Sequence, residues 1–394
     1  MHRGKRMYKI AFVATGYILD YDGVSVYIEN LVLRLLESES YENGALWIDL
    51  YLSRSAAALF EERVLSQADR RYLKVIVIDD TKPWKKFLSL QYRVLSGGRY
   101  GLVFMPNPMP LFFSFGRRMK VIHDLTIRRT PELFSKKLHL YIDFLIEYMR
   151  WFDDAIGYIS EQTKDDMARF YGIHKDQKKL CYLPNGIPFK VQNYTRPDLA
   201  ESLQKYNSAK QLSLVVVGRI NRSKGFDRIL AFLRYFDRQL ANEKIFEEVV
   251  LHVAGKQTEE TRKILEETAF GHIRLLFHGY VSDDTLNTLY QKSHFCFFLS
   301  RNEGYGLPLV EAMWMRTIPV ISDIPIFHEI MGESYIKFSD ESGYEEAIGN
   351  FIKKVFDDTS YRERLFTTLD NIVEKEKNGY IKAAENLIAY TKGE

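Results

Sequence analysis

Residues 300–313 read SRNEGYGLPLVEAM and follow an apolar run from His294 to Leu299. The run is short and aromatic, which favours a buried strand. Two glycines then permit a tight turn, and Pro308 stands in the first turn of a helix, where proline is tolerated. The stretch therefore predicts a strand, a glycine loop and a helix start. This arrangement directs unpaired backbone N–H groups and the positive end of the helix dipole toward the loop, which favours an anion such as a phosphate.

Two carboxylates flank this loop, Glu303 before the turn and Glu311 inside the expected helix. Carboxylates accept hydrogen bonds from hydroxyl groups. A ligand with a central phosphate and hydroxyl-rich ends, such as a nucleotide sugar, suits the pattern. Taken alone, the pair is equally compatible with two solvated glutamates around a helix cap.

A second strand, residues 212–217, ends in Gly218-Arg219 and is followed by Lys224-Gly225. Arginine grips phosphate oxygens with two parallel hydrogen bonds, and lysine supplies a mobile point charge. The two cations, five residues apart before an expected helix, predict a clamp for a diphosphate. Surface cations near a helix start are common, so this motif alone is a weak indicator.

The two motifs together resemble those of the retaining glycosyltransferases with the GT-B fold, family 4. EGYGLPLVE (residues 303–311) is similar to the family's glutamate signature, and the motif at residues 218–225 is similar to its phosphate-binding motif. The likeness implies an α/β protein of two Rossmann-like domains that face each other across a cleft. It covers nearly the whole chain, more loosely before residue 120.

The resemblance also implies roles for individual residues. Glu303 would hold hydroxyls of the transferred sugar, and Glu311 those of the ribose. Tyr280 and Val281 would line the nucleotide base, although a plain helix N-terminus explains their side chains equally well. The donor phosphates would be bound by Arg219, Lys224 and the amides from Gly304 to Leu309, which include Gly304, Tyr305, Gly306 and Leu307.

His123 follows the expected strand Lys120–His123, and functional loops of a parallel sheet lie at the carboxyl ends of its strands. Taken alone, it is a structural histidine satisfied by Asp124 or the backbone. The resemblance implies instead that it contacts the transferred sugar and belongs to the catalytic residues with Glu303. Gly23, after the expected loop Thr15–Asp22, would belong to a loop facing acceptor and phosphate, but the family's Gly-Gly pair is Asp22-Gly23 here.

Alternating strands and helices favour two parallel sheets wrapped by helices. Pro184–Pro188 is dense in turn-forming residues and marks a boundary. We expect an N-terminal acceptor domain of residues 1–190, completed by a C-terminal helix of residues 378–394, and a donor domain of residues 191–377. Further expected elements include strands at Leu46–Leu52, Leu73–Ile78 and Leu102–Met105, and a polar helix up to Glu266.

The net charge of +3 conceals an asymmetry. Residues 1–200 hold 30 Lys or Arg against 23 Asp or Glu, and residues 201–394 hold 25 against 29. A basic half suits a membrane, a nucleic acid or an anionic substrate. No nucleic-acid-binding motif is present, so we expect no nucleic-acid partner. Cys181 and Cys296 stand in apolar runs that favour buried thiols, and neither a zinc pattern nor a disulfide framework is present.

Three basic segments are candidates for contact with anionic lipid headgroups, with a plain solvated surface as the equal alternative. They are Lys82–Leu88, Arg117-Arg118 and Arg128-Arg129. The N-terminal apolar run is too short and lacks the cleavage site of a secretory signal. We therefore expect a cytoplasmic protein, with peripheral contact with the inner face of the plasma membrane left open.

The resemblance implies a retaining hexosyltransferase that needs neither a metal nor a cofactor. Its donor would be GDP-mannose or a UDP-hexose, and its acceptor a glycan or polyprenyl-linked oligosaccharide of a surface polysaccharide such as an O-antigen or exopolysaccharide. Two alternatives stay open, a sugar-nucleotide epimerase of related fold and an inactive, partner-binding homologue. An inactive homologue would be expected to lack Glu303, Arg219 or Lys224, and all three are present.

Overall fold

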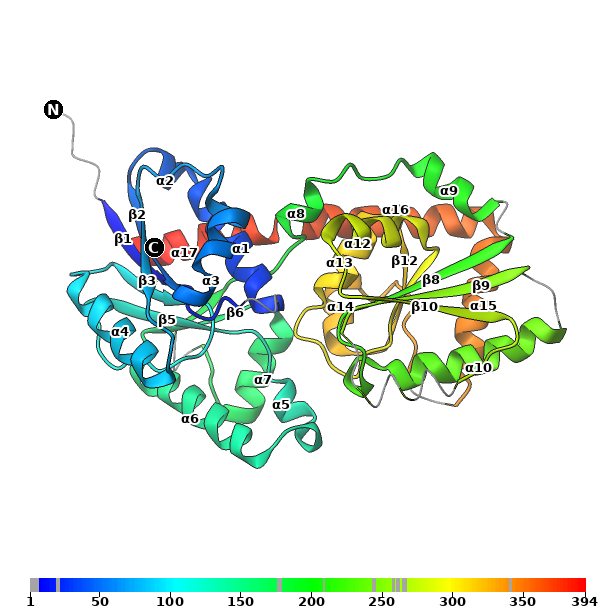
Figure 1. The fold of residues 1–394 in the computed structure, drawn as a ribbon, viewed down its shortest axis with the longest axis horizontal. Helices are drawn as coiled ribbons and strands as arrows, with labels where there is room; N and C mark the ends of the chain where they lie inside the picture. Colours follow the sequence, from blue (N-terminus) through cyan, green and yellow to red (C-terminus); the bar gives the residue numbers. More distant parts are fainter. Residues whose placement is uncertain are drawn as a thin grey trace. The chain divides into compact units, whose positions relative to one another are not determined.

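The computed structural model describes residues 7–18, 22–175, 179–207, 210–242, 246–256, 268–339 and 342–394, with Glu259 and Lys263. The chain divides into two compact units (Figure 1). Unit 1 comprises Met1–Asn185 and Asn378–Glu394, and unit 2 comprises Gly186–Lys377. The division falls within the turn-rich segment at residues 184–188. The loop expected at Thr15–Asp22 and the helix expected up to Glu266 lie partly outside the described residues.

Unit 1 contains a seven-stranded parallel sheet in the order β3-β2-β1-β4-β5-β6-β7. The expected strands at Leu46–Leu52, Leu73–Ile78 and Leu102–Met105 are confirmed within one residue. The order reverses between β1 and β4, so a ligand-binding crevice is expected at the carboxyl ends of these two strands. The strands are β1 (Tyr8–Val13), β2 (Leu46–Ser53), β3 (Leu73–Ile78), β4 (Leu102–Met105), β5 (Arg117–Ile122), β6 (Ala155–Tyr158) and β7 (Lys179–Tyr182).

Helices cover both faces of this sheet, as parallel strands require. α4 (Pro83–Ser96), α6 (Lys136–Phe152) and α7 (Glu161–Tyr171) pack on one face, and α1 (Gly23–Leu36) and α17 (Gly379–Lys392) pack on the other. The remaining helices of unit 1 are short: α2 (Glu39–Glu42), α3 (Arg54–Phe60) with the π-helix η1 (Glu61–Leu65), α5 (Thr126–Arg129) and the 3-10 helix η2 (Pro131–Leu133).

Strand β5 begins at Arg117, three residues before the start expected from the sequence. The reason is that its cations are paired inside the fold instead of standing in a loop. The side chains of Lys120 and Asp153 are both fully buried, with Nζ 2.7 Å from Oδ2. Arg118 Nε lies 3.5 Å from the other oxygen of Asp153, and the Lys120 ammonium also lies 4.5 Å from the centre of the Tyr148 ring.

Unit 2 contains a five-stranded parallel sheet in the order β10-β9-β8-β11-β12. Strands β11 and β12 are continuous apolar runs, as expected when both faces are covered. The strand order reverses between β8 and β11, so the ligand-binding crevice of unit 2 is expected at their carboxyl ends. The strands are β8 (Gln211–Val217), β9 (Glu248–Ala254), β10 (Ile273–Gly279), β11 (Phe295–Phe298) and β12 (Ile318–Ile321).

The helices described in unit 2 include two that begin at the carboxyl ends of strands near the reversal, α10 and α13. Long helices α15 and α16 complete the unit, and α10 packs against α15. The helices are α8 (Phe189–Gln192), α9 (Leu199–Asn207), the 3-10 helix η3 (Arg222–Lys224), α10 (Phe226–Asn242), α12 (Asp283–Lys292), α13 (Leu307–Trp314), α14 (Pro325–Met331), α15 (Tyr344–Asp357) and α16 (Thr359–Glu376).

Candidate active site

The loops that follow β8 and β11 are packed directly against each other. Gly225, after η3, has φ +68°, and a Cβ added there would lie 1.7 Å from the carbonyl oxygen of Leu299. Only glycine permits this approach, because any other side chain would overlap the backbone at the end of β11. The glycine after Lys224 therefore sets how closely the two motifs of unit 2 meet.

Arg301 ties the same two loops together, and sequence reasoning missed it. Its backbone N–H donates to the carbonyl of Ser223 at 2.9 Å. Its guanidinium donates to both carboxylate oxygens of Asp227 at 2.7 Å, and to the carbonyl of Arg222 at 2.6 Å. Arg301 stands inside the motif that starts the sequence argument, but Asp227 lies 74 residues away, and no local pattern links them.

Lys224 and Glu303, predicted from separate motifs, form a direct ion pair. Lys224 Nζ donates to Glu303 Oε2 at 2.6 Å. The hydroxyl of Ser300, itself buried at the end of β11, donates to Glu303 Oε1 at 2.8 Å. Two donors thus fix the carboxylate at the carboxyl end of β11, while its side chain stays partly exposed. The structure brings these two candidate residues together.

Arg219 follows β8 at the same edge of the sheet and is exposed. It forms no ion pair or hydrogen bond with any residue that the structure describes. Its preceding residue, Gly218, has φ +110° and lies against Gly255 in the loop after β9. The guanidinium is therefore available to a ligand.

The glycine loop leads into α13 as the sequence predicts, with Gly306 as the N-cap at φ +97°. The amides of Gly304, Gly306 and Leu307 have no acceptor among the described residues. The predicted set of amides extends too far, because Pro308 has no N–H and that of Leu309 donates to the carbonyl of Gly306 at 2.9 Å.

Tyr305 is buried, and its hydroxyl donates to the Glu376 carboxylate at the end of α16. Only its backbone remains a candidate for phosphate contact. The sequence motif could not reveal this, because Glu376 lies 71 residues further along the chain.

Glu311 lies in α13 and is buried, with a long hydrogen bond of 3.4 Å from the hydroxyl of Tyr290 on α12. Burial raises the pKa of its carboxyl, and the charge of Asp283 raises the pKa further, against the opposing effect of Lys190. A buried carboxylate with one weak donor is costly unless a ligand supplies more hydrogen bonds. Sequence reasoning missed Tyr290 and Lys190.

Tyr280 and Val281 join β10 to α12. The side chain of Tyr280 is exposed, and that of Val281 is partly buried. α12 begins two residues later, at Asp283, with its N-cap Ser282 accepting a hydrogen bond from the N–H of Thr285. The loop thus leads into α12, whose residues Asp283 and Tyr290 both act on the Glu311 carboxyl group.

His123 belongs to unit 1 and directly follows β5, as predicted. Its Nε2 lies 2.6 Å from the carbonyl oxygen of Pro106, after β4, so this nitrogen must carry a proton and donate. Burial lowers the pKa of the imidazole, which keeps it neutral with a lone pair on Nδ1. Tyr27 of α1 packs edge-on against the ring, with 4.9 Å between ring centroids.

Gly23 is the first residue of α1 and not the end of a loop. The preceding Asp22 caps the helix by accepting a hydrogen bond from the N–H of Ser25 at 2.9 Å. The position after Asp22 therefore starts a 14-residue helix at the carboxyl-end side of β1. Capping by Asp22 gives the departure from the Gly-Gly pair a structural reason.

Near the ends of β1 and β4, unit 1 has further polar residues that sequence reasoning missed. Lys86 reaches from α4 to the carbonyl of Thr15, after β1, at 2.7 Å, and burial lowers the pKa of its ammonium group. Asn107, after β4, packs against Gly16, and its buried Oδ1 has no hydrogen-bond partner among the described residues. Both groups offer polar atoms at the β1/β4 reversal, where the sheet topology places a ligand.

The described residues contain no group of three or more His, Cys, Asp or Glu side chains that could hold a metal ion. The ends of β8 and β11 present cations and backbone donors instead. Unit 2 can therefore hold an anion between Arg219, Lys224 and the start of α13. The carboxylates of Glu303 and Glu311 flank this anion site.

Comparison with known proteins gives a family match for part of the chain. Residues 200–368 match the family model described as glycosyl transferases group 1. The serotype-specific mannosyltransferase WbdA of Escherichia coli is 25% identical over 233 residues, which are 56% of this chain and 28% of WbdA. The chain thus spans less than a third of that relative's length.

Solved structures show the fold. WaaG, a glycosyltransferase involved in lipopolysaccharide biosynthesis, superposes with a TM-score of 0.66 at 13% identity, over 98% of this chain and all of WaaG. HepE of Anabaena, solved in complex with UDP-glucose, gives a TM-score of 0.62 at 15% identity, over 98% of this chain and 99% of HepE. The fold of this chain is the GT-B fold of these glycosyltransferases, and its residues 200–368 match the model of glycosyl transferases group 1.

Proposed function

We propose that this protein is a retaining glycosyltransferase that moves a hexose from a nucleotide sugar to a glycan or polyprenyl-linked acceptor during synthesis of a surface polysaccharide. The observation that carries the proposal is the ion pair between Lys224 and Glu303 at the β8/β11 reversal, 2.6 Å across. It joins a phosphate-binding cation to a hydroxyl-binding carboxylate at the edge of the sheet where ligands bind.

In this proposal the donor diphosphate occupies the space bounded by Arg219, Lys224 and the amides before α13. Negative charge develops on the diphosphate as it leaves. Fixed cations and N–H groups stabilise this charge without having to reorganise. No metal is then required. Glu303, held by Lys224 and Ser300, positions sugar hydroxyls near the reacting carbon and does not attack it. The leaving phosphate itself accepts the proton of the acceptor hydroxyl.

Glu311 binds the ribose hydroxyls in the same proposal, which would supply the donors that its buried carboxylate lacks. The neutral His123 contacts the transferred sugar, since its Nδ1 lone pair can accept a hydrogen bond from a sugar hydroxyl. The acceptor is assigned to unit 1, with the start of α1 at Gly23 facing the acceptor and the donor phosphate.

The names of the similar proteins point to two candidate donors. WbdA is a mannosyltransferase, which favours GDP-mannose, whereas HepE was solved with UDP-glucose, which favours a UDP-hexose. A thermal-shift screen of GDP-, UDP- and ADP-sugars would select the donor. Product analysis with lipid-linked acceptors would follow. Formation of an isomeric nucleotide sugar without acceptor glycosylation would overturn the proposal in favour of an epimerase.

Replacing Arg219 by alanine is expected to weaken donor binding about tenfold to hundredfold, because a charge-assisted hydrogen bond is worth about 1.5–3 kcal/mol. The free energy of unfolding should change by less than about 0.5 kcal/mol, since the side chain is exposed and has no partner in the described chain. Calorimetric titration with donor, beside urea denaturation, checks both. Arg222→Ala, at an exposed cation three residues away, is the control; equal losses from both variants would contradict a specific role for Arg219.

Replacing Glu311 by glutamine is expected to remove a pH dependence of donor binding. The raised pKa of Glu311 means that its carboxylate takes up a proton at a higher pH than an ordinary glutamate. Wild-type affinity should therefore fall as the pH drops through that raised pKa, because the charge-assisted bonds to the ribose are lost. Titration with the nucleoside diphosphate at a series of pH values tests this, and an unchanged profile in Glu311→Gln would contradict the assignment.

A further inference from the structure

Unit 1 exposes an unusual concentration of large apolar side chains. Of the nineteen exposed large hydrophobic residues in the described chain, twelve lie on α4, on the loop at residues 106–116 or on α6. Nine of these twelve are 55–72% exposed, which is far more than single surface positions need. We call the twelve residues the aromatic surface: Trp84, Leu88, Tyr92, Phe112, Phe113, Phe115, Leu138, Leu140, Tyr141, Phe144, Trp151 and Phe152.

Both helices of this surface carry a second apolar stripe in addition to the one that packs on the sheet. In α4, Leu90 and Val94 are buried, while Trp84, Leu88 and Tyr92 recur every four residues on a solvent-exposed stripe. α6 repeats the pattern, with a buried stripe around Leu145–Met149. An amphipathic surface helix needs only the first stripe for folding. The second stripe therefore requires another partner.

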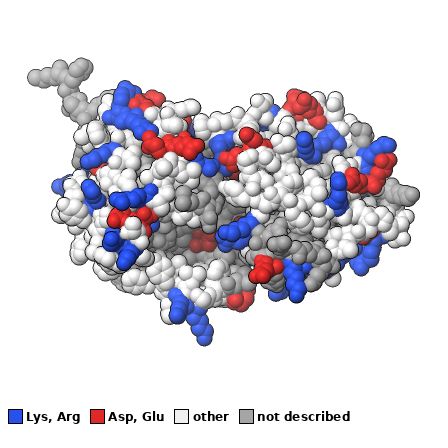
Figure 2. Space-filling view, in the orientation of Figure 1, with Lys and Arg blue, Asp and Glu red and all other residues white. Residues whose placement is uncertain are grey.

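The three elements form one continuous surface. The ring centroids of Phe87 on α4 and Phe112 on the loop are 5.4 Å apart, and those of Phe112 and Tyr148 on α6 are 5.7 Å apart. Tyr148 in turn stacks on Phe152 at 4.9 Å. In Figure 2 the region of unit 1 where Figure 1 has α4 and α6 has wide white areas, with basic and some acidic side chains among them.

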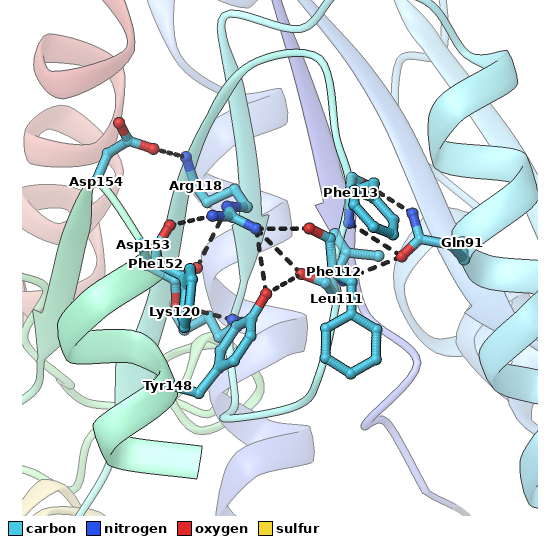
Figure 3. Close-up of polar contacts among 10 residues, drawn as sticks. All are labelled: Gln91, Leu111, Phe112, Phe113, Arg118, Lys120, Tyr148, Phe152, Asp153 and Asp154. Atoms are coloured by element: carbon cyan, nitrogen blue, oxygen red, sulfur yellow. Dashed lines mark hydrogen bonds and ion pairs between the residues drawn. The ribbon is translucent and has the colours of Figure 1, made fainter. Parts of the chain in front are cut away.

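The loop is fixed by polar contacts at its base, as Figure 3 shows. On the α4 side, Gln91 accepts hydrogen bonds from the N–H groups of Phe112 and Phe113 at 3.0 and 3.1 Å. On the α6 side, Arg118 donates to the carbonyls of Leu111 and Phe112 at 3.2 Å, and to that of Phe152. These contacts hold the loop in place while the side chains of Phe113 and Phe115 are exposed to solvent.

Basic residues outnumber acidic ones around this surface. Residues 81–120 contain eight Lys or Arg and no Asp or Glu. Lys120 and Arg118 are used inside the fold, and Lys86 binds Thr15. The acids of α6 are neutralised, since Asp143 pairs with Arg128 and Glu147 with Arg150. The cations left without ion pairs among the described residues are Lys82, Lys85, Arg93, Arg99, Lys136 and Lys137.

These contacts revise the three basic segments proposed from the sequence. Lys82–Leu88 remains, as the start of α4. Arg118 braces the loop, and Arg117 donates to the carbonyl of Thr391 in α17 at 2.7 Å. Arg128 and Arg129 are paired with Asp143 and Asp166. Lys82–Leu88 therefore stays a candidate for lipid contact, whereas the arginines of the other two segments are engaged within unit 1.

We propose that the aromatic surface is a docking site for an anionic lipid bilayer, into which the aromatic side chains insert while the surrounding cations contact the headgroups. Trp, Tyr and Phe suit the water–lipid interface because their rings are amphipathic or apolar, and each cation near an anionic surface adds attraction. No helix among the described residues has the length and apolarity to cross a bilayer. The contact is therefore peripheral and should weaken with salt.

Flotation with vesicles tests the proposal. The full-length protein is expected to bind vesicles of phosphatidylcholine and phosphatidylglycerol, and to bind phosphatidylcholine alone much less. The Trp84→Ser/Phe113→Ser/Trp151→Ser variant should bind the anionic vesicles at least about tenfold more weakly, and Lys82→Glu/Lys85→Glu should lose the salt-sensitive part. Phe277→Ser, an exposed aromatic residue on β10 of unit 2, should bind like the wild type.

Equal binding by the triple variant and the wild type, or no binding of the wild type to anionic vesicles, would overturn the proposal. Analytical ultracentrifugation distinguishes another occupant, because a dimer that the triple substitution dissociates would assign the surface to a second copy of the chain. Nucleotide-sugar binding, measured on the same samples, should be equal in all variants. Loss of vesicle binding is thus separable from a failure of the proposed transferase function, which rests on unit 2.

Discussion

Replacing Glu303 by alanine is expected to lower kcat for glycosyl transfer by about 10²–10³-fold or more, because removing one preorganised electrostatic contact of a reaction costs about that much. The carboxylate is held by Lys224 at 2.6 Å and by Ser300 at 2.8 Å, so it is positioned before the donor arrives. Its loss also frees Lys224 to move. A steady-state assay with the donor selected by thermal shift gives kcat and KM separately.

The fold should survive this substitution, since Glu303 is partly exposed and lies in a loop. Glu303→Gln is the stricter variant, because it keeps the size and the bond from Ser300 but removes the charge that faces Lys224. It should be nearly as inactive as Glu303→Ala. Glu346→Ala, at an exposed position in the first turn of α15, is a matched control elsewhere in unit 2. Near-normal turnover of Glu303→Ala would end its assignment to the transferred sugar.

Replacing Asp153 by alanine is expected to destabilise unit 1 by about 3–5 kcal/mol, because it leaves the ammonium of Lys120 buried without a countercharge. Both side chains have no exposed surface, so water cannot replace the lost partner. Urea denaturation followed by tryptophan fluorescence reports mainly on unit 1, which holds Trp47, Trp84 and Trp151, whereas Trp314 lies in unit 2.

The double variant Lys120→Met/Asp153→Leu separates this explanation from simple loss of packing. Replacing both charges by apolar groups of similar volume is often neutral or stabilising, so the double variant should recover most of the lost stability. If Asp153→Ala and the double variant were equally unstable, the cost would belong to the packing around β5 and not to the unpaired charge.

Much of the fold could be predicted from the sequence because the strands are buried on both faces. Continuous apolar runs such as Leu102–Met105 and Phe295–Phe298 are unambiguous when turn residues bound them. β5 is the exception, since one of its two covered faces carries Arg118 and Lys120. A strand with cations on its buried side can be recognised only when the acid that pairs with them, Asp153, is seen to be near.

The candidate site could be predicted where its residues belong to local motifs. Lys224 and Glu303 were found in this way, and the structure brings them into contact. The residues that hold the site together were not found, because their partners are remote in sequence: Arg301 with Asp227, Tyr305 with Glu376, and Glu311 with Tyr290. Local sequence spacing indicates which residues can bind a ligand. The residues that hold them in position come together only through the topology of the sheet.

The C-terminal helix α17 has a consequence for how the chain is made. Its side chains Tyr380, Ala384 and Leu387 are buried in unit 1, and Asn386 donates to the carbonyl of Tyr182 in β7 at 2.7 Å. Unit 2 is one uninterrupted stretch, and the ribosome completes it before α17. During synthesis unit 2 can therefore complete its fold first, while unit 1 keeps an uncovered apolar face against α1 until α17 emerges. We therefore expect that aggregation during translation starts from unit 1 and not from unit 2.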